Sequence, residues 1–152
     1  MSIDLFDIDT FRTLSDRTLD EYASRMLTLS CESFSIDDYD ELISMLPNAN
    51  EFHSVYIIEL CAKLDPNRFA PIAVTYLRSR IASLCCAASR VLGSIQSDAL
   101  SVEVRTLIEE CPIVELYWDD PATGVSRQVG TNEIFLSELR EKFGIGSKTA
   151  GQ

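Results

Sequence analysis

The sequence predicts a mainly α-helical fold in which short antiparallel helices are followed by a C-terminal β-hairpin and a final helix. Apolar residues recur every three or four positions over most of the chain, which is the spacing that places them on one face of an α-helix. Between residues 114 and 129 the apolar pattern changes to alternation, which is typical of β-strands. The connections between the predicted helices are short, and helices joined in this way pack as antiparallel neighbours.

Capping residues mark where the first helices begin. Ser15 and Asp16 are candidate caps for a first helix. Ser35 opens the next one, with Asp38 at the position where a capping box has its acid. Asn50 opens a third helix over residues 51–64, whose apolar positions surround much of the cylinder, so we expect it to be buried on more than one side. The predicted apolar face of the helix that begins at Ser35 consists of Ile36, Tyr39, Leu42, Ile43 and Leu46.

Prolines and small polar residues organise the helices that follow. Asp65 and Pro66 begin a helix in which Pro71 is expected to cause a kink or a restart, because proline lacks a backbone N–H and clashes with the preceding turn. A further helix is predicted over residues 80–94. Ser97 is expected to cap the helix after it.

The change of period near the C-terminus predicts a β-hairpin over residues 114–129. The segments VELYW and VSRQV alternate between apolar and polar residues, and DDPATG between them supplies turn residues. Thr131 is expected to cap a final helix that ends at Gly144. We expect one helical-repeat domain over residues 1–146 and a flexible tail over residues 147–152.

Two adjacent cysteines, Cys85 and Cys86, lie among small side chains in the segment SLCCAASRVLGSIQS. Adjacent helical residues point in different directions, so the pair cannot readily share a metal ion or a disulfide. We expect Cys85 to face the core, and Cys86 to join Ala82 and Gly93 in a seam against which a neighbouring helix packs closely. The five cysteines are an odd number without framework spacing, which predicts reduced thiols.

No segment of the sequence has the spacing of a catalytic or metal site. His53 is the only histidine, and no motif marks a nucleophile. The segment GIGSKT has Ser147 at a position where a phosphate-binding loop requires glycine. We therefore expect no enzymatic activity, no cofactor and no metal ion.

The net charge of −11 is unevenly distributed along the chain. Residues 1–51 contain 12 acidic and 3 basic side chains, hence a net charge of −9. Such a field repels the phosphates of nucleic acids and attracts basic proteins, but on charge alone a solvated surface that keeps the protein soluble is the favoured explanation. The chain has no secretory signal pattern and no apolar stretch of membrane-spanning length, so we expect it to be cytoplasmic.

Two clusters that combine acidic and aromatic residues are candidate partner-binding sites, because such side chains are common at protein interfaces. Asp37 and Asp38 also suit the positive end of a helix dipole, which is a structural role. Trp118 could instead anchor the hairpin on the helices. The candidate residues are Asp37, Asp38, Tyr39, Asp40, Glu41, Tyr117, Trp118, Asp119 and Asp120.

Residues 87–110, AASRVLGSIQSDALSVEVRTLIEE, resemble the HEAT-like repeat signature, in which a helix of small residues ends in Leu-Gly and the next helix opens with valine and closes on Leu-Ile. The segments LISML, VTYLR and VRTLI recur at intervals of about 31 residues, a period found in helical solenoids. The resemblance covers residues 36–110 and implies a HEAT-like antiparallel helical repeat, an α-solenoid fragment. The first 34 residues and the hairpin lie outside the pattern.

In size, charge and predicted fold the chain resembles the bacterial immunity proteins of toxin–immunity pairs, in which a small acidic helical protein binds and neutralises a toxin. The resemblance implies a cognate protein toxin with a basic domain, such as a nuclease, that is neutralised by occlusion and charge complementarity. It implies no nucleic acid, membrane or small-molecule partner. The alternative is an acidic secretion chaperone or regulatory adaptor that binds a peptide in the groove of the solenoid.

Overall fold

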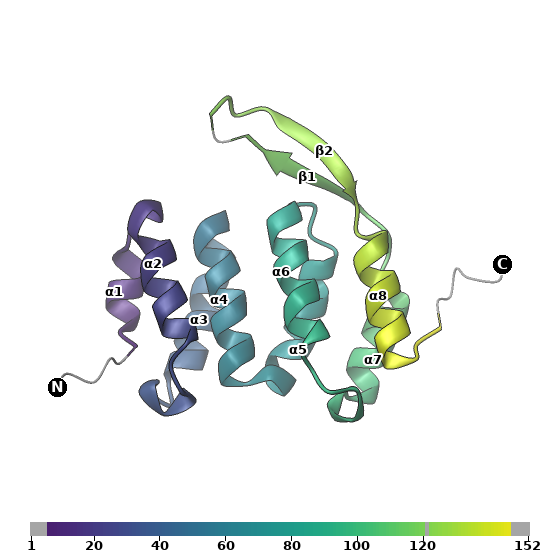
Figure 1. The fold of residues 1–152 in the computed structure, drawn as a ribbon, viewed down its shortest axis with the longest axis horizontal. Coiled ribbons are helices and arrows are strands. Elements are labelled where there is room, and N and C mark those ends of the chain that lie inside the picture. Colours follow the sequence, from purple (N-terminus) through teal and green to yellow (C-terminus); the bar gives the residue numbers. More distant parts are fainter. Residues whose placement is uncertain (1–5, 121, 147–152) are drawn as a thin grey trace. The chain divides into compact units, whose positions relative to one another are not determined.

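The computed structural model describes residues 6–120 and 122–146 (Figure 1). The chain divides into two compact units, Met1–Asp65 and Pro66–Gln152. The expected tail over residues 147–152 lies outside the described residues, as does Pro121 of the expected hairpin turn.

The N-terminal unit is a cluster of helices. Its elements are α1 (Ile8–Thr13), α2 (Asp16–Leu27), the 3₁₀ turn η1 (Cys31–Ser33), α3 (Asp38–Met45), the 3₁₀ turn η2 (Leu46–Asn48) and α4 (Glu51–Leu64). Both α2 and α3 pack against α4, and the short α1 packs against α2 and α3. The helices expected after Ser15, Ser35 and Asn50 are present, and α1 is an additional helix.

Two polar side chains organise the starts of α3 and α4. The side-chain oxygen of Asn50 accepts a hydrogen bond from the N–H of His53 at 2.8 Å, as expected for a cap of α4. The carboxylate of Asp38 accepts a hydrogen bond from the N–H of Ser35 at 2.6 Å. This is the acid half of the predicted capping box, but α3 begins at Asp38 and not after Ser35.

Aromatic rings close the core of the N-terminal unit beside α1. The ring centroid of Phe6 lies 5.8 Å from that of Phe11 and 5.0 Å from that of Phe34. Phe11 is fully buried, so apolar contacts hold α1 in place in addition to its own hydrogen bonds. The largest fully buried side chains of this unit are Phe11, Leu19, Met26, Leu42, Ile57, Ile58 and Leu60.

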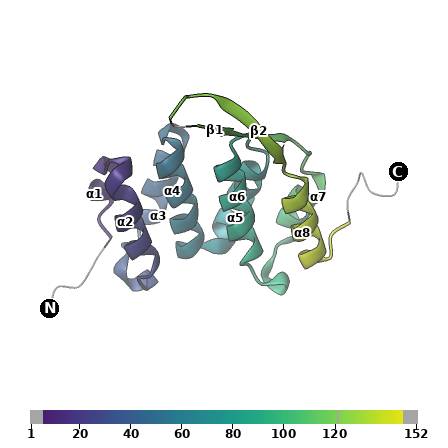
Figure 2. The same ribbon diagram turned by 45° about the horizontal axis from the view of Figure 1, so that its top comes forward.

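The C-terminal unit combines four α-helices with the hairpin. Its elements are α5 (Pro66–Leu77), α6 (Ala82–Gly93), the 3₁₀ turn η3 (Ser97–Ala99), α7 (Val102–Glu110), β1 (Glu115–Asp119), β2 (Ser126–Thr131) and α8 (Glu133–Phe143). Helix α5 packs against α6 and α7, and α8 packs against the same two helices (Figure 2). The strand β1 also contacts α6.

Two local expectations concern where the helices of this unit begin. Helix α5 continues through Pro71, so the expected restart does not occur, and a kink at this proline stays a prediction. Ser97 lies in η3, and the hydroxyl that caps α7 belongs to Ser101, which accepts a hydrogen bond from the N–H of Val104 at 3.2 Å. Ser97 is the wrong cap because it begins a short 3₁₀ turn that precedes the helix.

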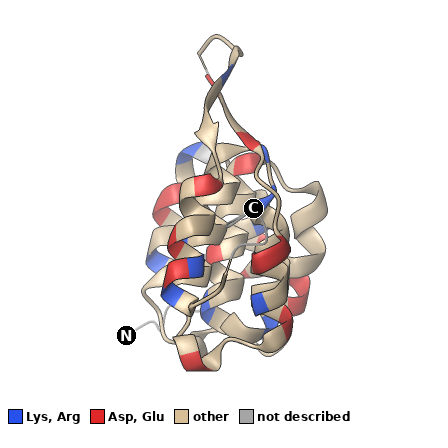
Figure 3. Cartoon of the chain, turned by 90° about the vertical axis from the view of Figure 1, so that its right-hand side faces the viewer, with Lys and Arg blue, Asp and Glu red and all other residues tan. Residues whose placement is uncertain are grey.

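The predicted hairpin is a two-stranded antiparallel sheet. Trp118 lies opposite Arg127, and the register shifts after Leu116, so that Val129 has no partner residue on β1. The neighbouring Gly130 has a φ of 138°, a conformation that glycine adopts without strain and that suits a β-bulge. The hairpin extends beyond the ends of the helices of its own unit (Figure 3).

Two arginines tie α7 and α8 together by their C-terminal ends. The guanidinium of Arg140 on α8 donates to the carbonyl oxygens of Ile108 and Glu109, each at 3.0 Å. The guanidinium of Arg105 on α7 donates to the carbonyl of Phe143 at 2.6 Å. Each arginine donates to carbonyl groups in the last turn of the other helix, and its charge suits the negative end of that helix.

The described residues form eight α-helices and one hairpin, which confirms the mainly helical fold with a C-terminal hairpin and a final helix. The HEAT-like repeat and the single domain over residues 1–146 stay predictions.

Candidate protein-interaction site

An isoleucine that directly precedes a group of acidic residues is exposed to solvent just before α3. Ile36 is 94% exposed, which is the highest exposure of the large apolar side chains that the structure describes. Asp37 and Asp40, its neighbours in sequence, are also exposed. Sequence periodicity wrongly assigned Ile36 to the buried face, because the pattern was continued through a turn that precedes the helix.

The other two candidates at the start of α3 are buried. Asp38 is 5% exposed and Tyr39 is 6% exposed. The carboxylate of Asp38 is used internally, since it accepts the hydrogen bond from the N–H of Ser35. At this place Ile36, Asp37 and Asp40 are therefore the residues whose exposure leaves them accessible.

Glu41 is half-buried and forms an ion pair within its own unit. Its carboxylate lies 3.7 Å from the guanidinium of Arg12, which also contacts the carboxylate of Asp9 at 3.2 Å. These exposed ion pairs contribute little to stability. They reduce the negative charge next to α1, so the field at the start of α3 comes mainly from Asp37 and Asp40.

Most of the net negative charge of the chain belongs to the N-terminal unit. Residues 1–65 contain 14 acidic and 4 basic side chains, hence a net charge of −10. Residues 66–152 contain 10 acidic and 9 basic side chains, hence −1. A basic partner is therefore attracted to the N-terminal unit, where the net negative charge is concentrated.

The hairpin carries the second group of candidates. Trp118 is 41% exposed, and the guanidinium of Arg127 lies over its ring, 5.7 Å from the centroid. Leu116, which is buried, anchors the base of the hairpin in place of the tryptophan. The hairpin therefore does not need Trp118 as its anchor on the helices, and part of the Trp118 ring is exposed to solvent.

Tyr117 is held in a fixed position at the base of the hairpin. Its N–H donates to the carbonyl of Arg80 at 2.7 Å, and its hydroxyl donates to the carboxylate of Glu115 at 2.7 Å. The hydrogen bond to Glu115 raises the pKa of the Tyr117 phenol, because it favours the protonated form. The guanidinium of Arg80 stacks over the ring, 5.0 Å from its centroid.

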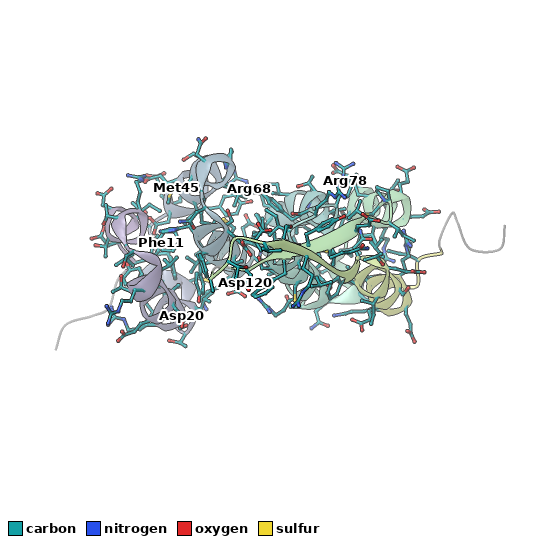
Figure 4. All side chains as sticks on the ribbon, turned by 90° about the horizontal axis from the view of Figure 1, so that it is seen from above. Phe11, Asp20, Met45, Arg68, Arg78 and Asp120 are labelled. Atoms are coloured by element: carbon teal, nitrogen blue, oxygen red, sulfur yellow. The ribbon has the colours of Figure 1, made fainter. Side chains whose placement is uncertain are left out.

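Asp119 and Asp120 differ in their roles. Asp119 is exposed at the end of β1. Asp120 shapes the turn, since its carboxylate accepts a hydrogen bond from the N–H of Ala122 at 2.9 Å and its carbonyl accepts one from the N–H of Gly124 at 2.7 Å. Figure 4 labels Asp120 at the end of the hairpin where the strands are joined.

The two groups of candidates are not shown to form one site. Residues 36–41 belong to the N-terminal unit and residues 117–120 belong to the C-terminal unit. Each group is therefore a candidate contact surface of its own unit.

His53 has a structural environment. Its Nε2 lies 3.2 Å from the carbonyl oxygen of Phe11, and its Nδ1 lies 3.2 Å from the side-chain oxygen of Asn50. A cavity of about 330 Å³ adjoins the ring and is lined by Arg12, Met45, Asn48, Ala49, Asn50 and His53. Both ring nitrogens are thus engaged with α1 and with the start of α4, which is the role of a packed histidine.

The adjacent cysteines Cys85 and Cys86 differ in burial. Cys85 is fully buried, its thiol lies 3.4 Å from the carbonyl of Leu77, and burial raises its pKa to about 12. Cys86 is exposed, so the expected seam of small residues is wrong at this position. A Cβ added at Gly93, the other end of that seam, would meet no atom within 4 Å.

The described part of the chain contains no group of three or more histidine, cysteine, aspartate or glutamate side chains placed to hold a metal ion. None of its helices has the length and apolar character that crossing a membrane requires.

We compared the chain with known protein families, curated proteins and solved structures. No family model, no curated protein and no solved structure matches the chain.

Proposed function

We propose that this protein is an immunity protein that binds a cognate bacterial toxin with a basic domain and neutralises it by occlusion. The observation that carries the proposal is Ile36, which is 94% exposed and is followed in the sequence by the exposed residues Asp37 and Asp40. An apolar side chain inside an acidic surface combines the two terms that binding to a basic protein uses, burial of apolar area and charge complementarity.

Charge supports the same partner. With a net charge of −10, residues 1–65 attract a basic domain over distances of several ångströms and raise its association rate at low salt. A nuclease domain is basic where it holds phosphates. Acidic side chains of the immunity protein would cover that surface and exclude the nucleic acid. In this proposal the helices over residues 36–110 form HEAT-like pairs in the cytoplasm of the toxin-producing cell.

Growth protection tests the immunity role. The protein encoded beside this chain in its genome is expressed from an inducible promoter, with and without the chain. We expect growth arrest without the chain and growth with it. Arrest in both strains, or no binding between the two purified proteins, would contradict the proposal.

Association kinetics test the surface. The double substitution Asp37→Lys and Asp40→Lys is expected to slow association with the basic partner at least tenfold at low salt and to flatten the dependence of the rate on salt. The matched control, Asp98→Lys and Glu138→Lys, makes the same change of charge at exposed positions of the C-terminal unit. Equal effects of the two doubles would assign the result to net charge alone. Asp38 is left unchanged because its carboxylate holds the turn before α3.

Ile36 is tested by truncation. Ile36→Ala is expected to increase the dissociation rate about tenfold if the side chain is buried by the partner. Val102→Ala is the control, since Val102 is an aliphatic side chain that is 79% exposed on α7 of the other unit. Equal dissociation rates for the two variants would remove Ile36 from the interface.

A second function is favoured by the hairpin, whose exposed apolar side chains suit an extended peptide. In this alternative the chain is a secretion chaperone or regulatory adaptor. The discriminating measurement is growth protection, since an immunity protein neutralises the folded toxin domain, whereas an adaptor that binds a short peptide of its partner gives no protection.

A further inference from the structure

We propose that the outer edge of β2 binds an extended segment of a partner protein, which joins the hairpin as a third, antiparallel strand with a carboxylate opposite Arg127. The inference rests on the proposed protein-binding function, because it states how a partner segment is held. It concerns a surface of the C-terminal unit and does not involve the start of α3.

The hydrogen bonding of the hairpin fixes which groups of β2 face outward. The N–H of Asp120 donates to the carbonyl of Val125 at 3.0 Å, so these two residues stand where an antiparallel ladder has a hydrogen-bonded pair. Such pairs alternate along an antiparallel ladder. Arg127 therefore bonds to β1, and the N–H and C=O groups of Ser126 and Gln128 point away from it.

The other edge of the hairpin is already covered. Tyr117 obeys the same alternation, and its N–H donates away from β2 to the carbonyl of Arg80. Ile81 forms a bridge to Tyr117 on this side. In the described part of the chain β2 has no second neighbour, since the sheet consists of β1 and β2 alone. The free main-chain groups thus lie on β2.

Exposed apolar side chains lie along the strand with the free edge. Val125 is 61% exposed and Val129 is 50% exposed. Val125 and Arg127 line a cavity of about 270 Å³ together with Trp118, Asp120 and Thr123. A strand added beside β2 would place its own side chains against Val125 and Val129, and would bury apolar area that is now in contact with water.

Arg127 determines the charge of the added strand. In the extended sheet Ser126 and Gln128 form the hydrogen-bonded pairs, so Arg127 lies in the type of pair that brings opposing side chains closest. A carboxylate at the opposing position would contact the guanidinium, which already stacks over Trp118. We therefore infer a segment with glutamate or aspartate opposite Arg127 and apolar residues two positions to either side.

A second copy of this chain fits the edge poorly. In one antiparallel register the outward N–H and C=O groups of Ser126 and Gln128 all find partners on the second copy. This register places Arg127 directly opposite Arg127 of the second copy, and like charges in that position are destabilising. Each copy also carries a net charge of −11. Other registers leave outward groups of β2 without partners.

The test uses the full chain and a synthetic peptide, acetyl-Thr-Val-Thr-Glu-Thr-Val-Thr-amide, whose glutamate can face Arg127 while its valines face Val125 and Val129. Binding is followed at millimolar peptide by NMR titration and by amide hydrogen exchange. We expect slower exchange of the Ser126 and Gln128 amides and little change at Arg127, whose amide already bonds to β1. A peptide with lysine in place of glutamate is expected to bind about tenfold more weakly.

Two substitutions at one position isolate the main-chain hydrogen bond. Gln128→Pro removes the outward N–H at an edge position where proline is tolerated, and we expect affinity to fall about tenfold. Gln128→Ala removes the same side chain but keeps the N–H, and its affinity is expected to equal that of the wild type. If Gln128→Pro does not fold, the exchange measurement on the wild-type chain decides by itself.

The outcomes separate this inference from the proposed function. No peptide binding at millimolar concentration, equal affinity for Gln128→Pro and Gln128→Ala, or protection confined to other amides would overturn it. Dimerisation in sedimentation that Gln128→Pro abolishes would also overturn it, because the occupant would be a second copy. Peptide binding together with failed growth protection would leave the strand site standing and would reject the immunity function.

Discussion

The side-chain amide of Asn132 donates a hydrogen bond to the main-chain carbonyl of Leu77 at 2.8 Å, and so joins the residue before α8 to the last residue of α5. The same amide donates to the carbonyl of Pro112 at 3.0 Å, and its oxygen accepts from the N–H of Val114 at 2.9 Å. Asn132 is 0% exposed. One buried side chain therefore satisfies three main-chain groups that surround the base of the hairpin.

Removing this amide is expected to destabilise the C-terminal unit. Asn132→Ala removes the hydrogen bonds to the buried carbonyl of Leu77 and to the partly buried carbonyl of Pro112 and N–H of Val114, so we expect a loss of about 3 kcal/mol in the free energy of unfolding, measured with urea. Asn132→Asp should cost at least as much, because it turns a carboxylate toward two carbonyl oxygens. Asn67→Ala, at an exposed position of α5, is the control and should change stability little.

Arg140 is expected to contribute through the carbonyls at the end of α7. Arg140→Met keeps much of the apolar stem but removes the hydrogen bonds to Ile108 and Glu109, and should destabilise the chain by about 2 kcal/mol. Arg17→Met, at an exposed position of α2, should have almost no effect. Equal urea midpoints for the two variants would show that the arginine does not stabilise α7.

Neighbouring aspartates before α3 should differ in their effect. Asp38→Ala removes the acceptor for the N–H of Ser35 and should cost about 1 kcal/mol. Asp37→Ala removes an exposed carboxylate that makes no side-chain cap hydrogen bond, and should leave stability within about 0.5 kcal/mol of the wild type. Thermal unfolding of the two variants under the same conditions gives the comparison, and a larger loss for Asp37→Ala would contradict it.

The thiols should react in two groups. Cys31 and Cys86 are exposed and are expected to be alkylated rapidly in the native protein, whereas Cys61, Cys85 and Cys111 should react only on unfolding. Mass spectrometry of peptides after brief alkylation identifies the modified positions. Because Cys86 is exposed, Cys86→Leu should be nearly neutral, whereas Cys85→Leu should cost about 1 to 3 kcal/mol by overpacking.

Alkaline pH should weaken the native state through Cys85. Burial raises the pKa of this thiol to about 12 in the folded protein, above its value of about 8.5 in an unfolded chain. The folded state therefore keeps a proton that the unfolded state releases, so its contribution is fully present below pH 8.5 and is lost as pH rises toward 12. Cys85→Ala should show a shallower fall of the unfolding free energy over this range, and parallel curves would contradict the assignment.

Helix positions were predictable from the sequence because their signals are local. Asn50 caps α4 as expected, since the cap and its partner N–H are three residues apart. The hairpin was predictable for the same reason, because alternation and turn residues lie within one short segment. The bulge was not predictable from the sequence, because it depends on the register in which β1 pairs with Gly130 on β2.

The candidate site was predicted only in part. Asp37 and Asp40 are exposed as a contact surface requires, but Asp38 and Tyr39 are buried, and Ile36 was assigned to the wrong side. A period of three to four residues predicts burial only where the chain is helical, and α3 begins two residues after Ile36.

The sequence by itself determined the helical class, the hairpin and the acidity of the N-terminal third, because composition, capping and periodicity are properties of neighbouring residues. Tertiary structure alone decided that Asn132 would join Leu77, Pro112 and Val114, and that β2 would keep a free edge. These features depend on groups far apart in the chain. Their partners are selected only when packing removes water and leaves each buried polar group to find another.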